Sequence, residues 1–299
     1  MSAILSSIHG LDYALSSWLT GLVIFYFAIV TAGGETAQRL LSDFPKRLRS
    51  VSLLTLLTSS VFILLSAQEM TESWAPSEIW RAMSMTSFGH LWCARLVILA
   101  LLSIPGPRLI RSLSGSGVIV LAVFIIPLLS VLSGHSASQS DHVAVRVITD
   151  WLHAASVGVW SGGLWMLAVW LGKRLSVSHF QSGPSLQVVR RFSHFAMAST
   201  AVITATGVLT SYLNGVPLLA PWTSLYGQII ILKIALFGIA LLAAAINQFV
   251  HIRRWNDENE IACVTAIRRE VRLEFYLLLI VFAAVGLLTR TALPGEVLQ

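Results

Sequence analysis

Long apolar runs, repeated along the whole chain, constrain its fold more than any other feature. A helix needs roughly 20 apolar residues to cross the hydrocarbon core of a bilayer. Strands of a membrane barrel would alternate apolar and polar residues, whereas these runs are continuous. The sequence therefore predicts an all-α, polytopic membrane helical bundle forming one integral domain over residues 1–299. Eight transmembrane helices are expected, near residues 11–31, 51–67, 88–104, 117–132, 151–171, 195–213, 229–249 and 271–288.

Composition agrees with this class, because only 11% of the residues are charged and 56% are hydrophobic. The few basic residues are unevenly distributed. Connections 32–50, 105–116, 172–194 and 250–272 together hold 15 of the 20 lysines and arginines, and the remaining loops and tails hold 3. Basic loops stay on the cytoplasmic side. We therefore expect both termini to be periplasmic. The net charge of +6 is explained by the orientation of the loops in a lipid bilayer, so we expect no nucleic-acid partner.

Histidines gather on the predicted outer side, around the stretch Leu132–Leu171. Two methionines precede the third span in the same outer region, and imidazole with thioether suits copper of either oxidation state. The candidate metal ligands are His9, His90, His135, His142, His153, Met83 and Met85. The alternative is that loop 68–87 is an amphipathic interfacial segment with a tryptophan belt. A lone histidine near a helix end is likewise usually structural.

Ionisable residues inside the predicted spans form a second group of candidates. Arg95 and Lys233 lie within helices, where a charge is costly unless it is paired inside the bundle or snorkels to the surface. Asp12 and Asp150 lie near outer helix ends and could orient imidazoles. We expect Lys233 to face Asp12 or Asp150.

Small and hydroxyl-bearing residues suggest how the helices pack. Ala154, Gly158 and Gly162 recur every four residues, which lets another helix approach closely. Thr200, Thr204, Gly207 and Ser211 share one face of the sixth span. That face could line a polar path, but such hydroxyls more often bond back to their own helix. Pro127 should kink the fourth span.

Motifs for soluble chemistry are missing from the sequence. No P-loop, dinucleotide fingerprint, HExxH or nucleophile elbow is present, so we expect no enzyme activity. Cys93 and Cys263 belong to opposite sides of the predicted membrane, so no disulfide is expected.

Several segments together resemble a known family. They are SGHSA at 133–137, LHAASVGVWSGGLWML at 152–167, RRFSHFAMASTAVITATGVLTSYL at 190–213, and the apolar segments 226–247 and 271–294. These resemble the CopD/PcoD-type copper resistance membrane proteins. The resemblance implies a multi-pass protein of the bacterial inner membrane in copper homeostasis, served by a periplasmic copper carrier of the CopC type. It implies copper as the bound ion and the outer histidines as its ligands.

Two functions follow from these residues. The first is a copper homeostasis protein that binds copper at its periplasmic side and moves it across or into the membrane. The second is a b-type haem-binding redox protein, since histidines on facing helices commonly hold haem iron. His90 and His153 would then form an outer pair, and His194 and His251 an inner pair. The outer methionines and the excess of outer histidines favour copper.

Overall fold

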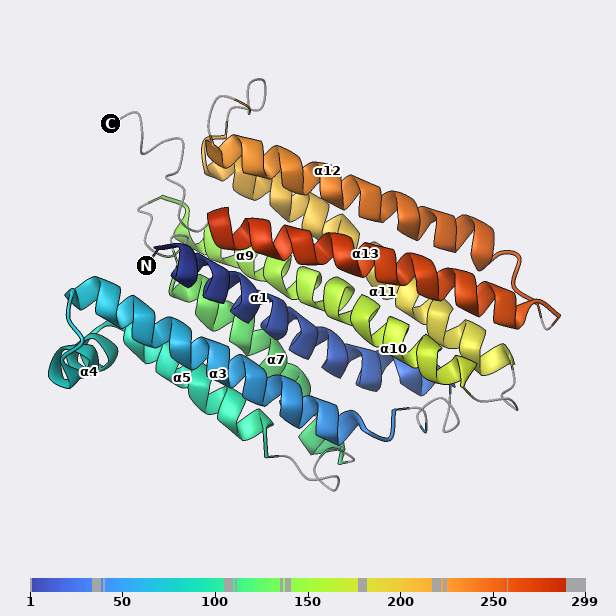
Figure 1. The fold of residues 1–299 in the computed structure, drawn as a ribbon, viewed down its shortest axis with the longest axis horizontal. Helices are drawn as coiled ribbons and strands as arrows, with labels where there is room; N and C mark the ends of the chain where they lie inside the picture. Colours follow the sequence, from blue (N-terminus) through green and yellow to red (C-terminus); the bar gives the residue numbers. More distant parts are fainter. Residues whose placement is uncertain are drawn as a thin grey trace.

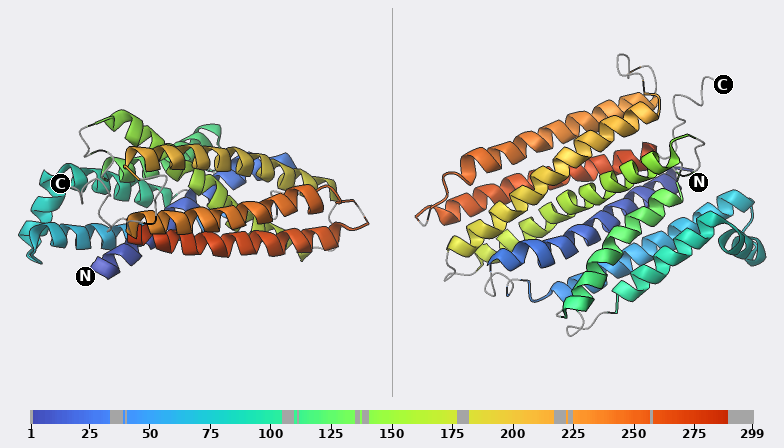
Figure 2. Two further views of the ribbon diagram at one scale, coloured as in Figure 1. Left: turned by 90° about the horizontal axis from the view of Figure 1, so that it is seen from above. Right: turned by 180° about the vertical axis from the view of Figure 1, so that it is seen from behind.

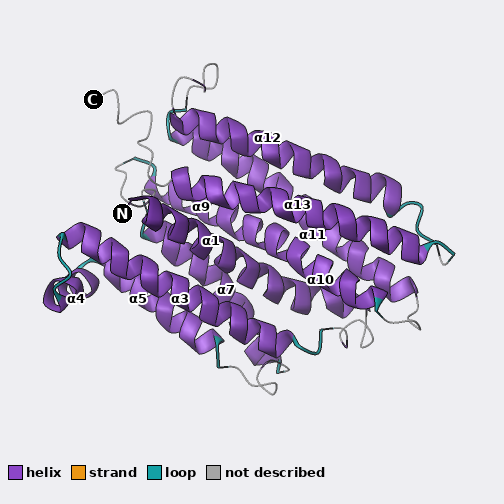
Figure 3. Ribbon diagram, in the orientation of Figure 1, coloured by secondary structure: helices purple, strands orange, loops and turns teal. Residues whose placement is uncertain are grey.

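The computed structural model describes residues 2–33, 39, 41–104, 110, 112–134, 137, 141–176, 182–216, 222, 225–256 and 258–288. Every regular element within these ranges is a helix (Figures 1 and 3). The longer elements are α1 (Ser2–Ile24), α3 (Phe44–Thr71), α4 (Pro76–Met85), α5 (Ser87–Leu102), α7 (Leu113–Leu132), α9 (Val143–Val157), α10 (Gly163–Leu175), α11 (Ser182–Leu213), α12 (Leu225–Ile246) and α13 (Glu260–Leu288). Three short π-helical segments, η1 (Phe25–Ile29), η3 (Gly158–Gly162) and η5 (Asn247–His251), extend some of these helices. A 3-10 turn, η2 (Val30–Gly33), follows η1.

The predicted all-α polytopic bundle is confirmed, but the count of eight spans is not. Among the described residues, six helices are long and apolar enough to cross a membrane, and the bent pair α4–α5 raises this to at most seven. The six are Ile4–Ile29, Phe44–Thr71, Gly115–Leu132, Val143–Leu175, Ser185–Leu213 and Gly227–His251. Each extends beyond its predicted bounds at one or both ends, because polar turns continue the helices past their apolar runs.

Helix α1 occupies the centre of the bundle (Figures 1 and 2). It packs against α3, α7, α13 and the continuous helix formed by α9, η3 and α10. In the most apolar stretch of the span that contains α1, 72% is buried inside the bundle. In the corresponding stretch of the span that contains α12, only 17% is buried. Polar residues of α1 therefore face other helices, whereas most of α12 is left for lipid.

The predicted small-residue stripe brings two backbones together. A Cβ added to Gly162 would lie 2.5 Å from the carbonyl oxygen of Ser17, and one added to Gly21 would collide with the backbone of Gly162. Side chains cannot fit at such separations, so glycine is required on both helices. Gly158 lies against Thr20 in the same seam. The expected close approach is thus confirmed, and α1 is the partner.

Helix α4 lies across the end of the bundle instead of along it. It meets α5 at a bend of 89°, and Trp74 and Trp80 beside and within it are 61% and 70% exposed. A transverse helix with exposed tryptophans is typical of a membrane–water boundary. The structure therefore favours the interfacial interpretation of loop 68–87 for its tryptophans.

Ion pairs hold the opposite end of the bundle together. Asp43, just before α3, accepts a 2.6 Å bond from the ammonium of Lys173 and a 2.8 Å bond from Arg47. Partial burial raises the pKa of Asp43, but the bond from Lys173 and the two positive charges outweigh this and hold it below its ordinary value. Arg174 pairs with Glu260 at 2.7 Å. These contacts tie the start of α3 to α10, and α10 to the start of α13.

Candidate intramembrane polar site

A buried ion pair joins the first and third predicted spans. Arg95 on α5 and Asp12 on α1 are each 2% exposed, and Nη2 of Arg95 lies 2.6 Å from Oδ2 of Asp12. The expectation that Arg95 finds a partner inside the bundle is confirmed, since a side chain this buried does not snorkel. A charge pair at this depth needs nearly complete hydrogen bonding to offset its desolvation.

Hydroxyl groups supply that bonding. Nη2 of Arg95 donates to Ser16 at 2.6 Å, and Nε lies 3.3 Å from Ser59. Nη1 contacts the hydroxyl of Ser130, and the guanidinium lies over the ring of Trp92 at 4.8 Å. The second carboxylate oxygen of Asp12 accepts from Ser59 at 2.5 Å and from Thr58 at 3.1 Å. Four helices therefore converge on one neutral, hydrogen-bonded unit.

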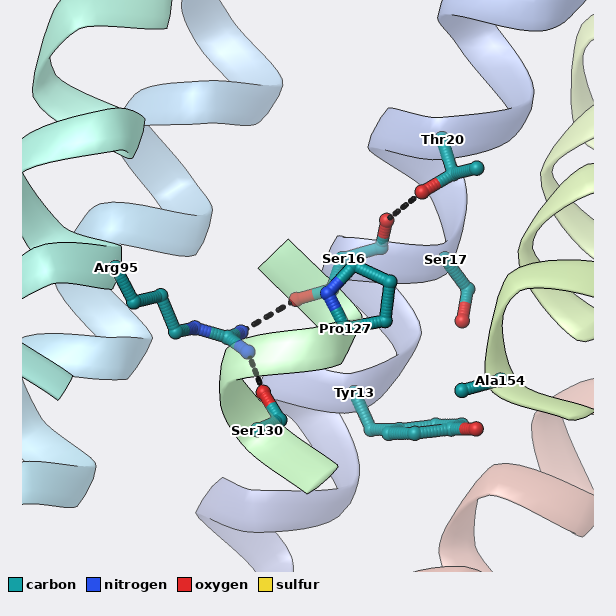
Figure 4. A pocket seen from close by; sticks show the side chains of 8 residues that line it. All are labelled: Tyr13, Ser16, Ser17, Thr20, Arg95, Pro127, Ser130 and Ala154. Carbon is teal, nitrogen blue, oxygen red and sulfur yellow. Dashed lines mark hydrogen bonds between the residues drawn. The ribbon is translucent and has the colours of Figure 1, made fainter. Parts of the chain in front are cut away.

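A small cavity borders this pair, between α1, α5, α7 and α9 (Figure 4). Its volume of about 20 Å³ suits roughly one water molecule. Pro127 lies in its wall and has no N–H to offer the carbonyl of Val123 one turn earlier. The hydroxyl of Thr20 lies 3.2 Å from that carbonyl oxygen. The proline thus leaves the carbonyl of Val123 without its usual backbone donor, and the hydroxyl of Thr20 on α1 takes that place. The remaining lining residues are Tyr13, Ser16, Ser17, Ser130 and Ala154.

A second polar cluster surrounds His153 on α9. Its Nδ1 lies 2.9 Å from the hydroxyl oxygen of Thr206 on α11. That hydroxyl already directs its hydrogen to the carbonyl of Val202, at 2.6 Å. The tautomer with the proton on Nδ1 fits this arrangement, with Thr206 as the acceptor, and the backbone of Ile203 makes a second hydrogen bond to the ring. In a neutral imidazole the lone pair is then on Nε2, which is the arrangement found in metal-binding histidines.

Opposite charges lie beside this imidazole. Lys233 on α12 interacts electrostatically with both Asp150 and His153. Asp150 accepts a 2.8 Å bond from Thr210 and also acts on Tyr13 of α1. Lys233 is thus near enough to Asp150, one of its two expected partners, for the two charges to interact, while Asp12 pairs with Arg95. The cluster connects α1, α9, α11 and α12.

The candidate ligands at the outer end are not gathered into one site. The ring of exposed His90 makes a 2.7 Å bond to the carbonyl of Ser84, and Met85 is 78% exposed. The backbone of Met83 lies directly against Gly89. Exposed His142 begins α9 with a positive φ of 50°, and the ring of His9 lies 4.7 Å from that of Phe62.

His135 lies outside the described residues. Among the residues that are described, no three His, Cys, Asp or Glu side chains stand close enough together to hold a metal ion. Cys93 and Cys263 are free thiols.

Hydroxyls are the functional residues that sequence reasoning missed. On α11, Thr204 and Ser211 bond back to their own helix, at 2.8 Å to the carbonyls of Thr200 and Gly207. The residues that serve the site are Thr206 and Thr210, one helical turn apart on a neighbouring face. Thr206 and Thr210 are four residues apart, and their partners His153 and Asp150 on α9 are three apart, so each pair lies about one helical turn apart.

Comparison with known proteins agrees with the resemblance to copper resistance proteins. Residues 1–145 match the family described as Copper resistance protein D-like, N-terminal domain, and residues 186–288 match Copper resistance protein D. Copper transport protein CutJ of Bacillus subtilis is 28% identical over 228 residues, which are 74% of this chain and 40% of CutJ. Inner membrane protein YebZ of Escherichia coli is 26% identical over 258 residues, which are 80% of this chain and 83% of YebZ.

No solved structure matches the chain. The chain spans less than half the length of CutJ, so that relative has a large part without a counterpart here. The two family matches lie on either side of residues 146–185 and together cover most of the sequence. The chain therefore belongs to the CopD-type family of copper resistance membrane proteins.

Proposed function

We propose that this protein binds copper at its periplasmic side and moves it across or into the inner membrane. The observation that carries the proposal is the hydrogen bond between Nδ1 of His153 and the hydroxyl of Thr206. It favours the tautomer with the proton on Nδ1, in which Nε2 has a lone pair to offer inside a membrane bundle. Ligating histidines are generally oriented in this way by a hydrogen bond at the other ring nitrogen. The names and families of the relatives support copper as the ion.

His153 is proposed as the inner ligand of the path. His9, His90, His135 and His142, with Met83 and Met85, are proposed as the ligands that collect copper at the outer end. Exposure of His90, His142 and Met85 suits a surface that receives an ion from a periplasmic carrier of the CopC type. Thioethers and imidazoles accept Cu(I) readily. No catalytic step is proposed.

Metal analysis with a visible spectrum tests this function against the haem alternative. Purified protein supplied with copper should retain the metal after desalting and should show no haem absorption. The measurement is metal content per chain together with the spectrum of the reduced and oxidised protein. A haem spectrum with bound iron, and no retained copper, would establish the redox function instead.

The orientation of the bundle is also a proposal, supported by the predominance of basic residues in alternate loops. Alkaline phosphatase fused after Gln299 should be active, because that enzyme folds only outside the cytoplasm. The matched control is the same fusion placed after Arg254, in a basic loop, where it should be inactive. An inactive C-terminal fusion with an active one after Arg254 would reverse the orientation and place His90 in the cytoplasm.

A further inference from the structure

A second, larger cleft lies apart from the polar clusters described above. Its volume is about 190 Å³, and residues of η3, α10, α11, α12, η5 and α13 line it. Apolar side chains form most of its wall, among them Trp160, Phe192 and Phe249. One acidic side chain, Glu274 of α13, lines it and is only 1% exposed. A carboxyl group this deep in a membrane bundle is costly unless it is neutral or paired.

Two buried amide oxygens that line the same cleft as Glu274 lack a hydrogen-bond donor among the described residues. The amide nitrogen of Asn247 donates to Oε1 of Glu274 at 3.0 Å. The amide oxygens of Asn247 and Gln248 are buried, belong to residues that line the same cleft, and have no hydrogen-bond partner in the described part of the chain. Both amides belong to η5, the widened turn at the end of α12. Widened turns of this kind are frequent at functional sites.

No positive side chain balances this carboxyl. The described residues that line the cleft include no lysine, arginine or histidine. On α13 itself the neighbouring charge that acts on Glu274 is the acidic Glu270. Arg174 of α10 pairs with Glu260. Arg268, on α13 itself, lies with its guanidinium against Gly172 of α10, its buried Nε has no hydrogen-bond partner in the described part of the chain, and it is not among the charges that act on Glu274. The described lining thus offers no cation to Glu274, and the two amide oxygens are left without a donor.

We infer that Glu274 is a proton-binding site, in which its carboxylic acid donates a hydrogen bond to one of the two amide oxygens of η5. A proton supplies the missing donor and removes the uncompensated charge in one step. Copper fits poorly, because the acceptors are oxygens and the one sulfur in the lining is that of Met197. A phosphate or other anion would meet a carboxylate with no positive partner. The proton site is independent of the proposed copper function.

Infrared difference spectroscopy on the purified full-length protein tests the site. A carboxylic acid has a C=O stretching band that an ionised carboxylate lacks. At neutral pH the wild-type protein should show such a band, which disappears as the pH is raised and is lost in Glu274→Gln. The matched control is Glu270→Gln, one turn away on the same helix, in which the band should persist.

Asn247→Ala keeps the test decisive even where Glu274→Gln folds poorly. Removal of the amide donor should shift the frequency of the same band and should not abolish it. The inference is overturned if no band responds to either variant. It is also overturned if the band is lost in sodium chloride but present in choline chloride, because the site then binds an alkali cation. Because none of these measurements involves copper, failure here is distinct from failure of the copper proposal.

Discussion

Replacement of Arg95 by leucine should strongly destabilise the protein. The change leaves the carboxylate of Asp12, 2% exposed, without its positive partner. Removal of one member of a buried ion pair typically costs about 3–5 kcal/mol, because the remaining charge is stranded in a low-dielectric interior. The loss should be measured as the free energy of unfolding in mixed micelles.

An exposed arginine provides the matched control. Arg81 on α4 pairs with Glu78 at 2.7 Å, but its side chain is 67% exposed. Arg81→Leu should therefore cost less than about 1 kcal/mol, as exposed ion pairs generally do. The double variant Arg95→Leu/Asp12→Leu should recover part of the stability lost in Arg95→Leu, because no charge is stranded. Equal stability of Arg95→Leu and Arg81→Leu would show that Asp12 is satisfied by its hydroxyl partners alone.

The buried ion pair between Arg95 and Asp12 was partly predictable from the sequence. A lone arginine seven residues into an apolar run has to find a partner, and Asp12 was among the few acidic residues on the same side. The helical class and the glycine seam follow from simple periodicities, since apolar runs and four-residue spacing report directly on burial and close approach.

Other features depend on contacts between segments far apart in the chain. The bond between His153 and Thr206 spans 53 positions, and nothing local marks Thr206 over Thr204. Likewise, nothing in the local sequence places the two amides of η5 near Glu274, because that proximity depends on how α12 packs against α13. Two of the eight expected spans are not among the six described helices that are long and apolar enough on their own: α5, which qualifies only as a bent pair with α4, and α13.

Substitution of His153 by alanine should remove the copper that is proposed to bind within the membrane bundle. The imidazole is held by Thr206, at 2.9 Å from its hydroxyl oxygen, in the tautomer that leaves the lone pair on Nε2 under this proposal. Copper retained per chain should fall, and copper-dependent growth should change with it. His194→Ala is the matched control, because His194 is exposed on α11 and should leave both measurements unaltered.

Thr206→Val separates a ligand from a merely structural histidine. The valine keeps the shape of the side chain but removes the acceptor that fixes the Nδ1 proton, so His153 loses its orientation. Loss of such a supporting hydrogen bond typically weakens metal binding by about 10–100-fold. Affinity should also fall at acidic pH, because protonation of Nε2 competes with the metal. If His153→Ala and Thr206→Val both bind copper as the wild type does, with normal insertion, His153 only joins α9 to α11, and the copper ligands lie among the outer residues.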